Sequence, residues 1–290
     1  MSHPVLVTGA TGQQGGALAR RLLADGVPVR ALTRDTTAPA ARELAALGAE
    51  VVPGAIDDPA ALKAAATGAS GVFSVQPVAG YSAAADFDET AAGKSLVDAA
   101  VAAGAGHLVY ASANSAEVDF GIPHMGNKRV IEEYVAASGL SHTILRPTSF
   151  MENFLDARFG LRGDALAMAL LPEVPMQLIA LDDIAAVAAA AFADPAGYDG
   201  RVFELAGDVL TGPGIAAAIA GAVGREVAYT PIPLEELRKH GENAVRGFEA
   251  LNSGRATRAD IGALRAEFPA LLDFGAWLAS GGAEKLRAAM

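Results

Sequence analysis

Short runs of β-branched residues alternate with longer stretches whose apolar residues recur at helical spacing along the first half of the chain. This pattern predicts six strands, at residues 5–8, 29–33, 50–53, 71–75, 107–111 and 142–146. It predicts helices between and after them, at residues 15–24, 40–47, 59–67, 86–103 and 125–138. Because strands that alternate with helices form parallel sheets, we expect an α/β fold with a doubly wound parallel sheet.

The regular alternation ends after Pro147, where a Met- and Leu-rich segment begins. Further elements follow in a less regular order: strands at 176–180, 202–205 and 227–230, and a helix that begins at Asp182 and Asp183. We therefore expect a first domain over residues 1–150 and a smaller C-terminal substrate lobe over residues 151–290. The segment of about 176–208 is expected to return to the first domain.

Charge and composition narrow the classes of function. The 290 residues carry a net charge of −11. This charge argues against binding to nucleic acid or to an anionic membrane surface, because both need clustered Lys and Arg on the protein. The N-terminus shows no signal peptide, and the longest apolar run, 184–193, is about half of the roughly 20 residues that a membrane span requires. We expect a cytoplasmic monomer or homodimer that acts on a small molecule.

Metal and thiol chemistry are not expected. The chain has no cysteine, which excludes disulfides and thiolate ligands. Histidines lie scattered without the spacing of metal ligands, at His3, His107, His142 and His240. The sequence therefore predicts no metal site.

A glycine-rich turn follows the first predicted strand and opens an Ala- and Leu-rich helix. In such a turn Gly9 permits the tight bend, Gly12 lets the backbone approach a pyrophosphate, and Gly15 lets helix and strand pack closely. The remaining predicted contacts come from the same turn and the first helical residues: Thr11, Gln13 and Gln14. The turn could also merely close a strand–helix unit, but its position favours a Rossmann-type dinucleotide site.

The end of the second strand indicates which dinucleotide is bound. An acidic residue there would bond the ribose hydroxyls of NAD, whereas this strand ends in Thr33-Arg34. Arg34 can pair with a 2′-phosphate, although Asp35 beside it weakens the positive field and a solvated surface arginine is the alternative. We expect NADP(H) to be preferred over NAD(H).

With these residues in place, the chain resembles the NmrA-like family of atypical short-chain dehydrogenases, which includes quinone and dye reductases and NADP-binding redox regulators. The resemblance spans most of the chain and rests on Val7-Thr8-Gly9-Ala10-Thr11-Gly12, Leu32-Thr33-Arg34, Gly71-Val72-Phe73, Lys128 with Glu132-Glu133-Tyr134, residues 145–153, residues 179–185 and residues 203–207.

The resemblance implies further contacts with the cofactor. Gln76 and Pro77 would border the nicotinamide ribose, and residues 149–153 would border the nicotinamide itself. Within the latter segment, Ser149 and Phe150 are assigned to the cofactor, and Phe150, Met151 and Asn153 to the substrate. Core packing is the alternative for Phe150, Met151 and Phe154. The adenine would be met by the backbone at Ile56 or by Asp57, because relatives often carry an acidic residue where this chain has Ala55.

The catalytic assignment is less complete. Standard short-chain dehydrogenases use Tyr-x-x-x-Lys on one helix face, and here His124 stands four residues before Lys128 in place of the tyrosine. We expect Lys128 to bind the ribose hydroxyls and His124 to be either a proton donor or a helix-cap or loop residue.

Two functions follow from that replacement. One is an NADPH-dependent reductase of quinone-like or other conjugated acceptors, which can dispense with a strong acid. The other is a non-catalytic NADP(H)-binding redox sensor.

Overall fold

The computed structural model describes residues 3–78 and 82–290, and the chain divides into two compact units. The first unit comprises Met1–Glu117, His124–Arg146 and Ile184–Phe203. The second comprises Val118–Pro123, Pro147–Asp183 and Glu204–Met290. Each unit is thus assembled from segments that lie far apart in the sequence. The domain boundary expected at residue 150 stays a prediction, because two compact units need not be two domains that fold independently.

A seven-stranded sheet forms the centre of the first unit. Its strands are β1 (Val5–Val7), β2 (Val29–Thr33), β3 (Glu50–Pro53), β4 (Gly71–Ser74), β5 (His107–Ala111), β6 (His142–Pro147) and β11 (Arg201–Leu205). They lie in the order β11-β6-β5-β4-β1-β2-β3, and each neighbouring pair from β3 to β6 is parallel. The six predicted parallel strands are therefore confirmed, and β11 extends the sheet beside β6.

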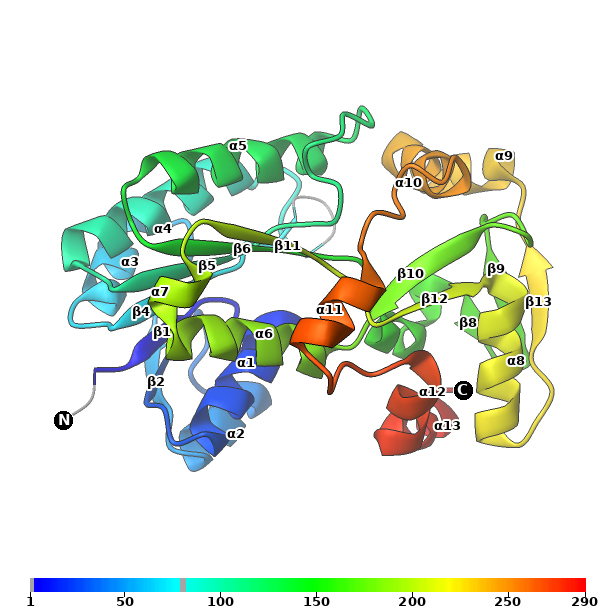
Figure 1. Ribbon diagram of the computed structural model, residues 1–290, viewed down its shortest axis with the longest axis horizontal. Coiled ribbons are helices and arrows are strands. Elements are labelled where there is room, and N and C mark those ends of the chain that lie inside the picture. Colours follow the sequence, from blue (N-terminus) through cyan, green and yellow to red (C-terminus); the bar gives the residue numbers. More distant parts are fainter. Residues whose placement is uncertain (1–2, 79–81) are drawn as a thin grey trace. The chain divides into compact units, whose positions relative to one another are not determined.

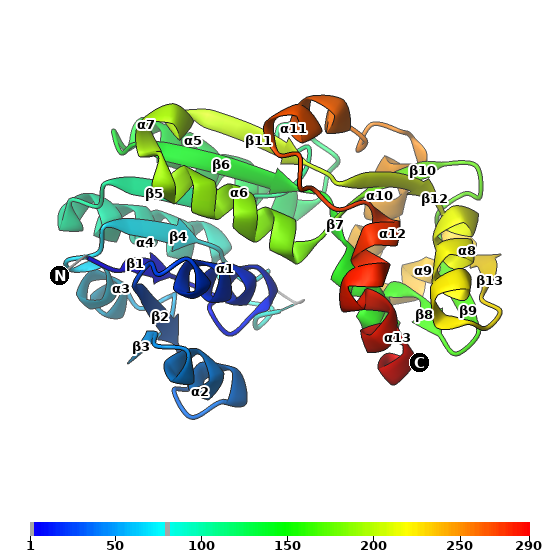
Figure 2. The same cartoon turned by 60° about the horizontal axis from the view of Figure 1, so that its bottom comes forward.

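Helices cover both faces of this sheet (Figures 1 and 2). Those associated with the first unit are α1 (Gln13–Ala24), α2 (Pro39–Ala46), α3 (Pro59–Ala66), α4 (Glu89–Ala103), α5 (Pro123–Ala137), α6 (Leu181–Ala193) and α7 (Pro195–Tyr198). One face carries α3, α4 and α5, and the other carries α1, α2 and α6. The fold is the Rossmann-type, doubly wound α/β fold that the sequence predicts.

The face under α3, α4 and α5 is almost wholly apolar. Leu6, Val72 and Leu108 from the strands pack against Leu96 of α4 and Ile131 of α5. Side chains that point to this face but carry polar atoms are therefore exceptions to the composition of the core. Two of them, Ser74 and Tyr110, lie near the carboxyl ends of β4 and β5.

Local signals fix where α4 begins and ends. The carboxylate of Asp88 accepts a hydrogen bond from the Ala91 amide at 2.9 Å, which satisfies one of the free N–H groups of the first turn. The helix ends at Gly104, whose φ of 65° is the left-handed conformation that glycine adopts without strain. Glu89 is thereby placed as the first residue of the helix.

The order of the strands reverses between β1 and β4, which is where open α/β sheets bind ligands. The glycine turn follows β1, and Val75 and Gln76 follow β4. The topology therefore brings these two segments to one edge of the sheet.

The second unit contains two small sheets. Their strands are β7 (Ser149–Phe150), β8 (Leu161–Arg162), β9 (Ala165–Met168), β10 (Pro175–Ile179), β12 (Asp208–Thr211) and β13 (Ala228–Pro231). In one sheet β10 pairs with β12 antiparallel and with β7 parallel, and in the other β9 pairs with β8 antiparallel and with β13 parallel. Of these six strands the sequence predicts only β10 and β13.

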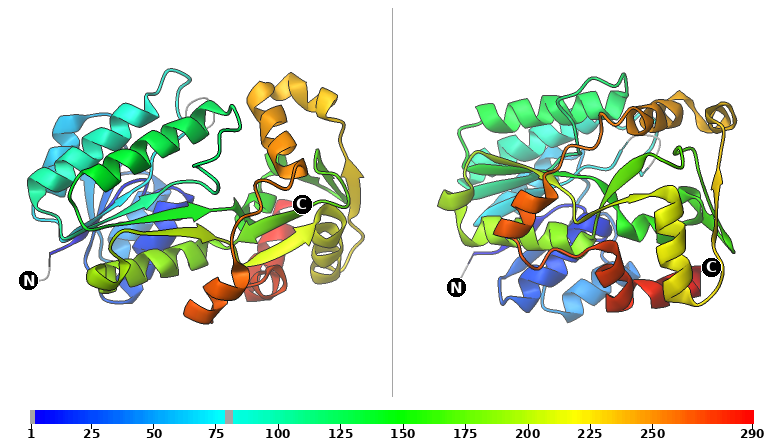
Figure 3. Two further views of the ribbon diagram at one scale, coloured as in Figure 1. Left: turned by 45° about the horizontal axis from the view of Figure 1, so that its top comes forward. Right: turned by 45° about the vertical axis from the view of Figure 1, so that its right-hand side comes forward.

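The second unit also holds the remaining helices. They are α8 (Gly212–Val223), α9 (Leu234–Leu237), α10 (Glu242–Asn252), α11 (Ile261–Glu267), α12 (Phe274–Trp277) and α13 (Ala283–Ala289), with the short helical segments η1 (Met151–Leu155), η2 (Ala157–Phe159), η3 (Arg238–His240) and η4 (Leu278–Gly282). The yellow helix α8 lies against β9 and β13 (Figure 3). Its buried Ile215 and Ile219 share an apolar core with Phe154, Phe274 and Trp277.

Asp183 joins two segments of the second unit. Its carboxylate Oδ2 accepts a hydrogen bond from the Leu272 amide at 3.0 Å, and the residue is buried. Burial, together with the charges of Asp182 and Glu152, raises the pKa of Asp183 to about 7, although the Leu272 amide and Arg265 oppose the shift.

Asp183→Asn should therefore stabilise the protein increasingly as the pH rises. The folded-state pKa of Asp183, about 7, lies above its unfolded value of about 3.9, so the wild-type protein loses stability as the pH rises through 7. The amide in Asp183→Asn keeps an acceptor for Leu272 and does not ionise. Thermal unfolding at about pH 6 and about pH 8 measures this, and a difference between variant and wild type that is the same at both pH values would contradict it.

Candidate functional site

The glycine turn is closed tightly on itself. The Gly12 amide donates to the Gly9 carbonyl at 2.8 Å, and Gly9 has a φ of 59°, in the left-handed region. A Cβ on Gly15 would lie 2.4 Å from the Gly9 oxygen and 2.5 Å from the Thr8 oxygen. Only glycine fits at this position, because helix α1 approaches the end of β1 so closely.

Thr8 ties the turn to the neighbouring strand. Its Oγ1 donates toward the Phe73 carbonyl at 3.0 Å and accepts from the Val75 amide at 3.0 Å. Its side chain is fully buried, so these bonds are shielded from water. The ends of β1 and β4 are therefore held in register, and the turn that follows β1 is fixed in place. Sequence reasoning did not assign Thr8 to the site.

The N-terminus of α1 is open to a ligand. Its N-cap is Gly12, which offers no side-chain cap, and the first turn contains no acidic residue. Gly9, Thr11, Gly12 and Gln13 are exposed around it. Free N–H groups and the positive end of the helix dipole favour a phosphate at such a terminus.

Arg34 is exposed directly after β2, next to this turn in the sheet order. The carboxylate of Asp35 is engaged elsewhere, since its Oδ1 accepts from the Thr37 hydroxyl at 2.6 Å and the Thr37 amide at 2.8 Å. The Thr37 hydroxyl is also the main cause that lowers the pKa of Asp35. Arg34 thus extends from the strand end without an ion pair to its acidic neighbour.

The segment after β3 places the two residues expected near the adenine. Ile56 is half-buried at the margin of the first unit's core, and Asp57 is exposed. The neighbouring Asp58 instead caps α3, accepting from the Ala60 amide at 2.9 Å. Asp57 is therefore not needed as the helix cap, and the adenine role of Ile56 and Asp57 stays a prediction.

Gln76 and Pro77 follow β4 at the strand reversal. Gln76 is only 4% exposed, and its Nε2 donates to the Ser74 hydroxyl at 2.8 Å. Its Oε1 has no hydrogen-bond partner among the described residues. A buried amide oxygen without a partner costs stability unless a ligand or water supplies a donor.

His124 lies in the first turn of α5 and is half-buried. Burial lowers the pKa of His124 from its usual 6.5; the Lys128 charge also lowers it, whereas Glu89 raises it. The neutral imidazole is therefore the main form at neutral pH. The imidazolium, which can donate a proton, is the main form only under acidic conditions.

Lys128 is buried on the same helix. Its side chain is 7% exposed, and its Nζ lies 2.7 Å from Oε1 of Glu89, whose side chain is fully buried. The ammonium also lies 5.8 Å from the ring centre of Tyr110 on β5. Lys128 is therefore not a solvated surface lysine, and its main partner, Glu89, was not foreseen from the sequence.

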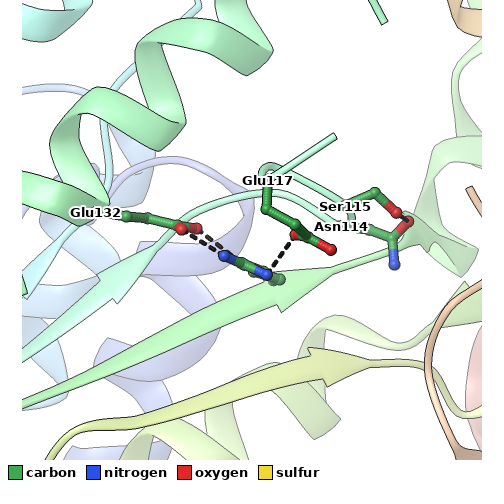
Figure 4. A network of polar contacts seen from close by, with 5 residues as sticks. Asn114, Ser115, Glu117 and Glu132 are labelled. Carbon is green, nitrogen blue, oxygen red and sulfur yellow. Dashed lines mark hydrogen bonds and ion pairs between the residues drawn. The ribbon is translucent and has the colours of Figure 1, made fainter. Parts of the chain in front are cut away.

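A second charged cluster holds the loop between β5 and α5 (Figure 4). Arg146 of β6 donates from Nε and Nη2 to the two carboxylate oxygens of Glu132 at 2.9 and 2.6 Å, and its Nη1 forms an ion pair with Glu117. The fork geometry of the guanidinium fixes both carboxylates at once. Glu117 anchors the loop that leads to His124.

The residues expected beside the nicotinamide lie in the second unit. Ser149 and Phe150 pair with Leu178 and Ile179 of β10, and both are half-buried, as is Asn153. Met151 is fully buried in the core of that unit. Their roles in binding cofactor and substrate stay predictions.

Glu152 fixes this segment inside the second unit. Its Oε1 accepts from the Trp277 indole at 3.0 Å, and its carboxylate also accepts from the Leu181 amide. Burial raises the pKa of Glu152, partly offset by these hydrogen bonds. The segment 149–153 is therefore held by three parts of the chain.

Two further observations on the described residues concern metal binding and membrane crossing. No set of three His, Asp or Glu side chains within 3–78 and 82–290 is grouped to hold a metal ion. Over the same ranges, none of the helices combines the length and the apolar character that crossing a membrane would take.

Two curated reductases are similar to the chain over most of its length. It is 32% identical to the "NAD(P)H azoreductase" of Xenophilus azovorans, over 81% of this chain and 79% of that protein. It is 34% identical to the "(4-alkanoyl-5-oxo-2,5-dihydrofuran-3-yl)methyl phosphate reductase" of Streptomyces griseus, with the same coverage.

The fold is shared with a solved regulator. The structure of Nmra, described as a negative transcriptional regulator in complex with NAD, superposes with a TM-score of 0.82 at 21% identity, over 99% of this chain and 98% of that one. At this identity the likeness concerns the fold alone. The NmrA-like family matches the chain over residues 1–263, and the protein belongs to that family.

Proposed function

We propose that the protein is an NADPH-dependent reductase of quinone-like or other conjugated small molecules. The observation that carries this proposal is the uncapped N-terminus of α1 behind the Gly9–Gly15 turn, with Arg34 at the next strand end. The reductases among its relatives support an enzymatic role, and one of them reduces azo compounds by name.

The residues of the turn fit a dinucleotide. The backbone at Gly12 and the first N–H groups of α1 would hold the pyrophosphate, and Arg34 the 2′-phosphate. Gln76 and Lys128 would hold the nicotinamide ribose, with Ser149 and Phe150 beside the nicotinamide. When bound, NADPH supplies a hydride.

The chain's own groups suit an acceptor that is easily reduced. Hydride addition to a quinone or an extended conjugated system yields a resonance-stabilised anion, which water can protonate. The Lys128 ammonium would stabilise that negative charge. His124 is mostly neutral near neutral pH, so it would contribute little as an acid. A carbonyl reductase would need the tyrosine that His124 replaces.

Steady-state NADPH oxidation with a panel of quinones and azo dyes tests the proposal. The expected result is saturable turnover of at least one acceptor above the rate without protein. Tight NADPH binding with no turnover of any acceptor would contradict it.

We expect His124→Gln to retain kcat within about tenfold of wild type at about pH 8, because little imidazolium is available there to donate a proton. If His124 does donate, the wild-type rate must fall as the pH rises through its lowered pKa, and the variant must lose that dependence. Steady-state rates between about pH 5 and pH 8 decide this. A loss of about a hundredfold or more at pH 8 would show that His124 is an essential acid.

A second candidate is a redox sensor that binds NADP(H) without turnover, favoured by the replacement of the catalytic tyrosine by His124. Its signature would be affinities for NADPH and NADP⁺ that differ, together with no acceptor reduction. In either case we expect a cytoplasmic monomer or homodimer that binds neither nucleic acid nor membrane.

A further inference from the structure

We propose that Glu89 is a positioning residue for the reaction: it holds the Lys128 ammonium at the edge of the sheet and keeps it charged. The inference rests on the proposed function, in which Lys128 binds the cofactor ribose. It concerns a residue that lies outside every motif of the sequence.

An ion pair at this buried position contributes little to the stability of the fold. Glu89 has a fully buried side chain, and that of Lys128 is 7% exposed. Desolvation of both charges offsets most of their attraction, so apolar side chains of similar size would stabilise such a position at least as well. Stability therefore does not explain why two charged residues occupy this position.

The contact also leaves hydrogen-bonding capacity unused. Lys128 Nζ lies 2.7 Å from Glu89 Oε1, yet neither oxygen of Glu89 has an aligned hydrogen-bond partner among the described residues. The contact is thus an ion pair, and an ammonium has three N–H donors, so it can also donate to a ligand hydroxyl.

Polar groups on the sheet beneath the pair share this property. Ser74 of β4 pairs with Tyr110 of β5, so both side chains lie on the same face, and Gln76 and Ser112 follow each of them by two residues. Over the described residues, Gln76 Oε1, Tyr110 Oη and Ser112 Oγ have no hydrogen-bond partner, although none of these residues is more than 4% exposed.

These unpartnered atoms point to a polar ligand at this end of the sheet. Buried polar groups in native proteins are nearly always satisfied, by protein, water or ligand. Three such groups lie in or shortly after two adjacent strands, below an ammonium held by a buried carboxylate. This is the carboxyl edge of β4 and β5, next to the reversal of strand order where the cofactor is expected.

The charges around Lys128 show why Glu89 matters. His124 lies one turn earlier on α5, and Tyr110 lies below, with Glu132 farther along α5. Burial raises the pKa of Tyr110 well above 10, so the phenol is neutral, and burial lowers that of His124. Glu132 is engaged by Arg146. Glu89 is therefore the carboxylate that balances the ammonium.

Removing that carboxylate should make cofactor binding sensitive to pH. In Glu89→Gln the ammonium is buried without a counter-ion, which favours the neutral amine. A neutral amine binds the ribose hydroxyls more weakly and offers no charge to a developing anion.

NADPH dissociation constants measured at about pH 7 and about pH 9.5 test the proposal. We expect the wild-type constant to change less than about threefold and that of Glu89→Gln to rise by about tenfold or more. Glu133→Gln is the matched control, since Glu133 is an exposed carboxylate on α5, and it should behave as wild type. Glu89→Asp, which restores the charge, should bind more weakly at both pH values but without the added pH dependence.

Equal pH dependence in wild type and Glu89→Gln would overturn the proposal, because a merely structural pair would weaken binding uniformly. If Glu89→Gln fails to fold, the wild-type protein provides the second measurement. The Lys128 ammonium, labelled with ¹⁵N and assigned with Lys128→Arg, should give a slowly exchanging NMR signal that shifts when NADPH is added. An unshifted signal would equally overturn the proposal. Because both readouts measure binding, they remain valid if no acceptor is ever reduced.

Discussion

Gly15→Ala should weaken NADPH binding by about tenfold or more and lower the unfolding temperature as well. The added Cβ would lie 2.4 Å from the Gly9 oxygen and 2.5 Å from the Thr8 oxygen, distances that no real Cβ contact shows. Both obstacles are backbone atoms, so no side chain can rotate away. The cost should be about 1–3 kcal/mol, as for other overpacked sites, and the turn must open to reduce it.

Titration of NADPH into wild type and Gly15→Ala, with thermal unfolding of both, measures the two effects. Gly221→Ala is the matched control: Gly221 lies in α8, and a Cβ there meets no atom within 4 Å. Because alanine favours a helix, this control should bind NADPH as wild type and unfold at the same or a higher temperature. Wild-type affinity in Gly15→Ala would remove the turn from the cofactor site.

Arg34→Ala should weaken NADPH binding by about tenfold to a hundredfold while leaving NADH almost unchanged. The 2′-phosphate distinguishes the two cofactors, and a charge-assisted hydrogen bond to it contributes about 1.5–3 kcal/mol. Arg34 is exposed at the end of β2, and the Asp35 carboxylate beside it is turned to Thr37. The guanidinium is therefore free of the partner that would compete most directly with the phosphate.

Dissociation constants of both cofactors for wild type and Arg34→Ala test this assignment. Arg129→Ala serves as the control, because Arg129 is an exposed arginine paired with Glu133 on α5. It should change neither constant. Equal losses for NADPH and NADH in Arg34→Ala would mean that Arg34 acts on a part that both cofactors share, and the preference for NADP(H) would be wrong.

The first unit could be predicted well because its signals are local. The predicted bounds of β2, β3 and β5 coincide with the observed strands, each of which is a short run that contains valine. The Gly9, Gly12 and Gly15 spacing follows β1 directly, so one short stretch of sequence defines both the turn and its chemistry. The family membership inferred from these motifs is confirmed.

Other features depend on pairing between distant segments, which periodicity does not encode. Strands β7 and β8 are two residues each, too short to show an alternation of polar and apolar positions. The sequence does not distinguish Glu89 from its acidic neighbours Asp86 and Asp88. Its buried position follows from the cap at Asp88, which makes Glu89 the first residue of α4. The Lys128 partner and the Arg146 cluster could therefore not be read from the chain.

We propose that this protein binds NADPH and passes its hydride to a conjugated acceptor. The most direct test is a single turnover without oxygen, in which protein carrying one equivalent of NADPH is mixed with a naphthoquinone. We expect NADPH to be lost and hydroquinone to appear in equal amounts, faster than in the absence of protein. Bound NADPH that stays reduced with every quinone and azo dye offered would contradict hydride transfer and favour the sensor.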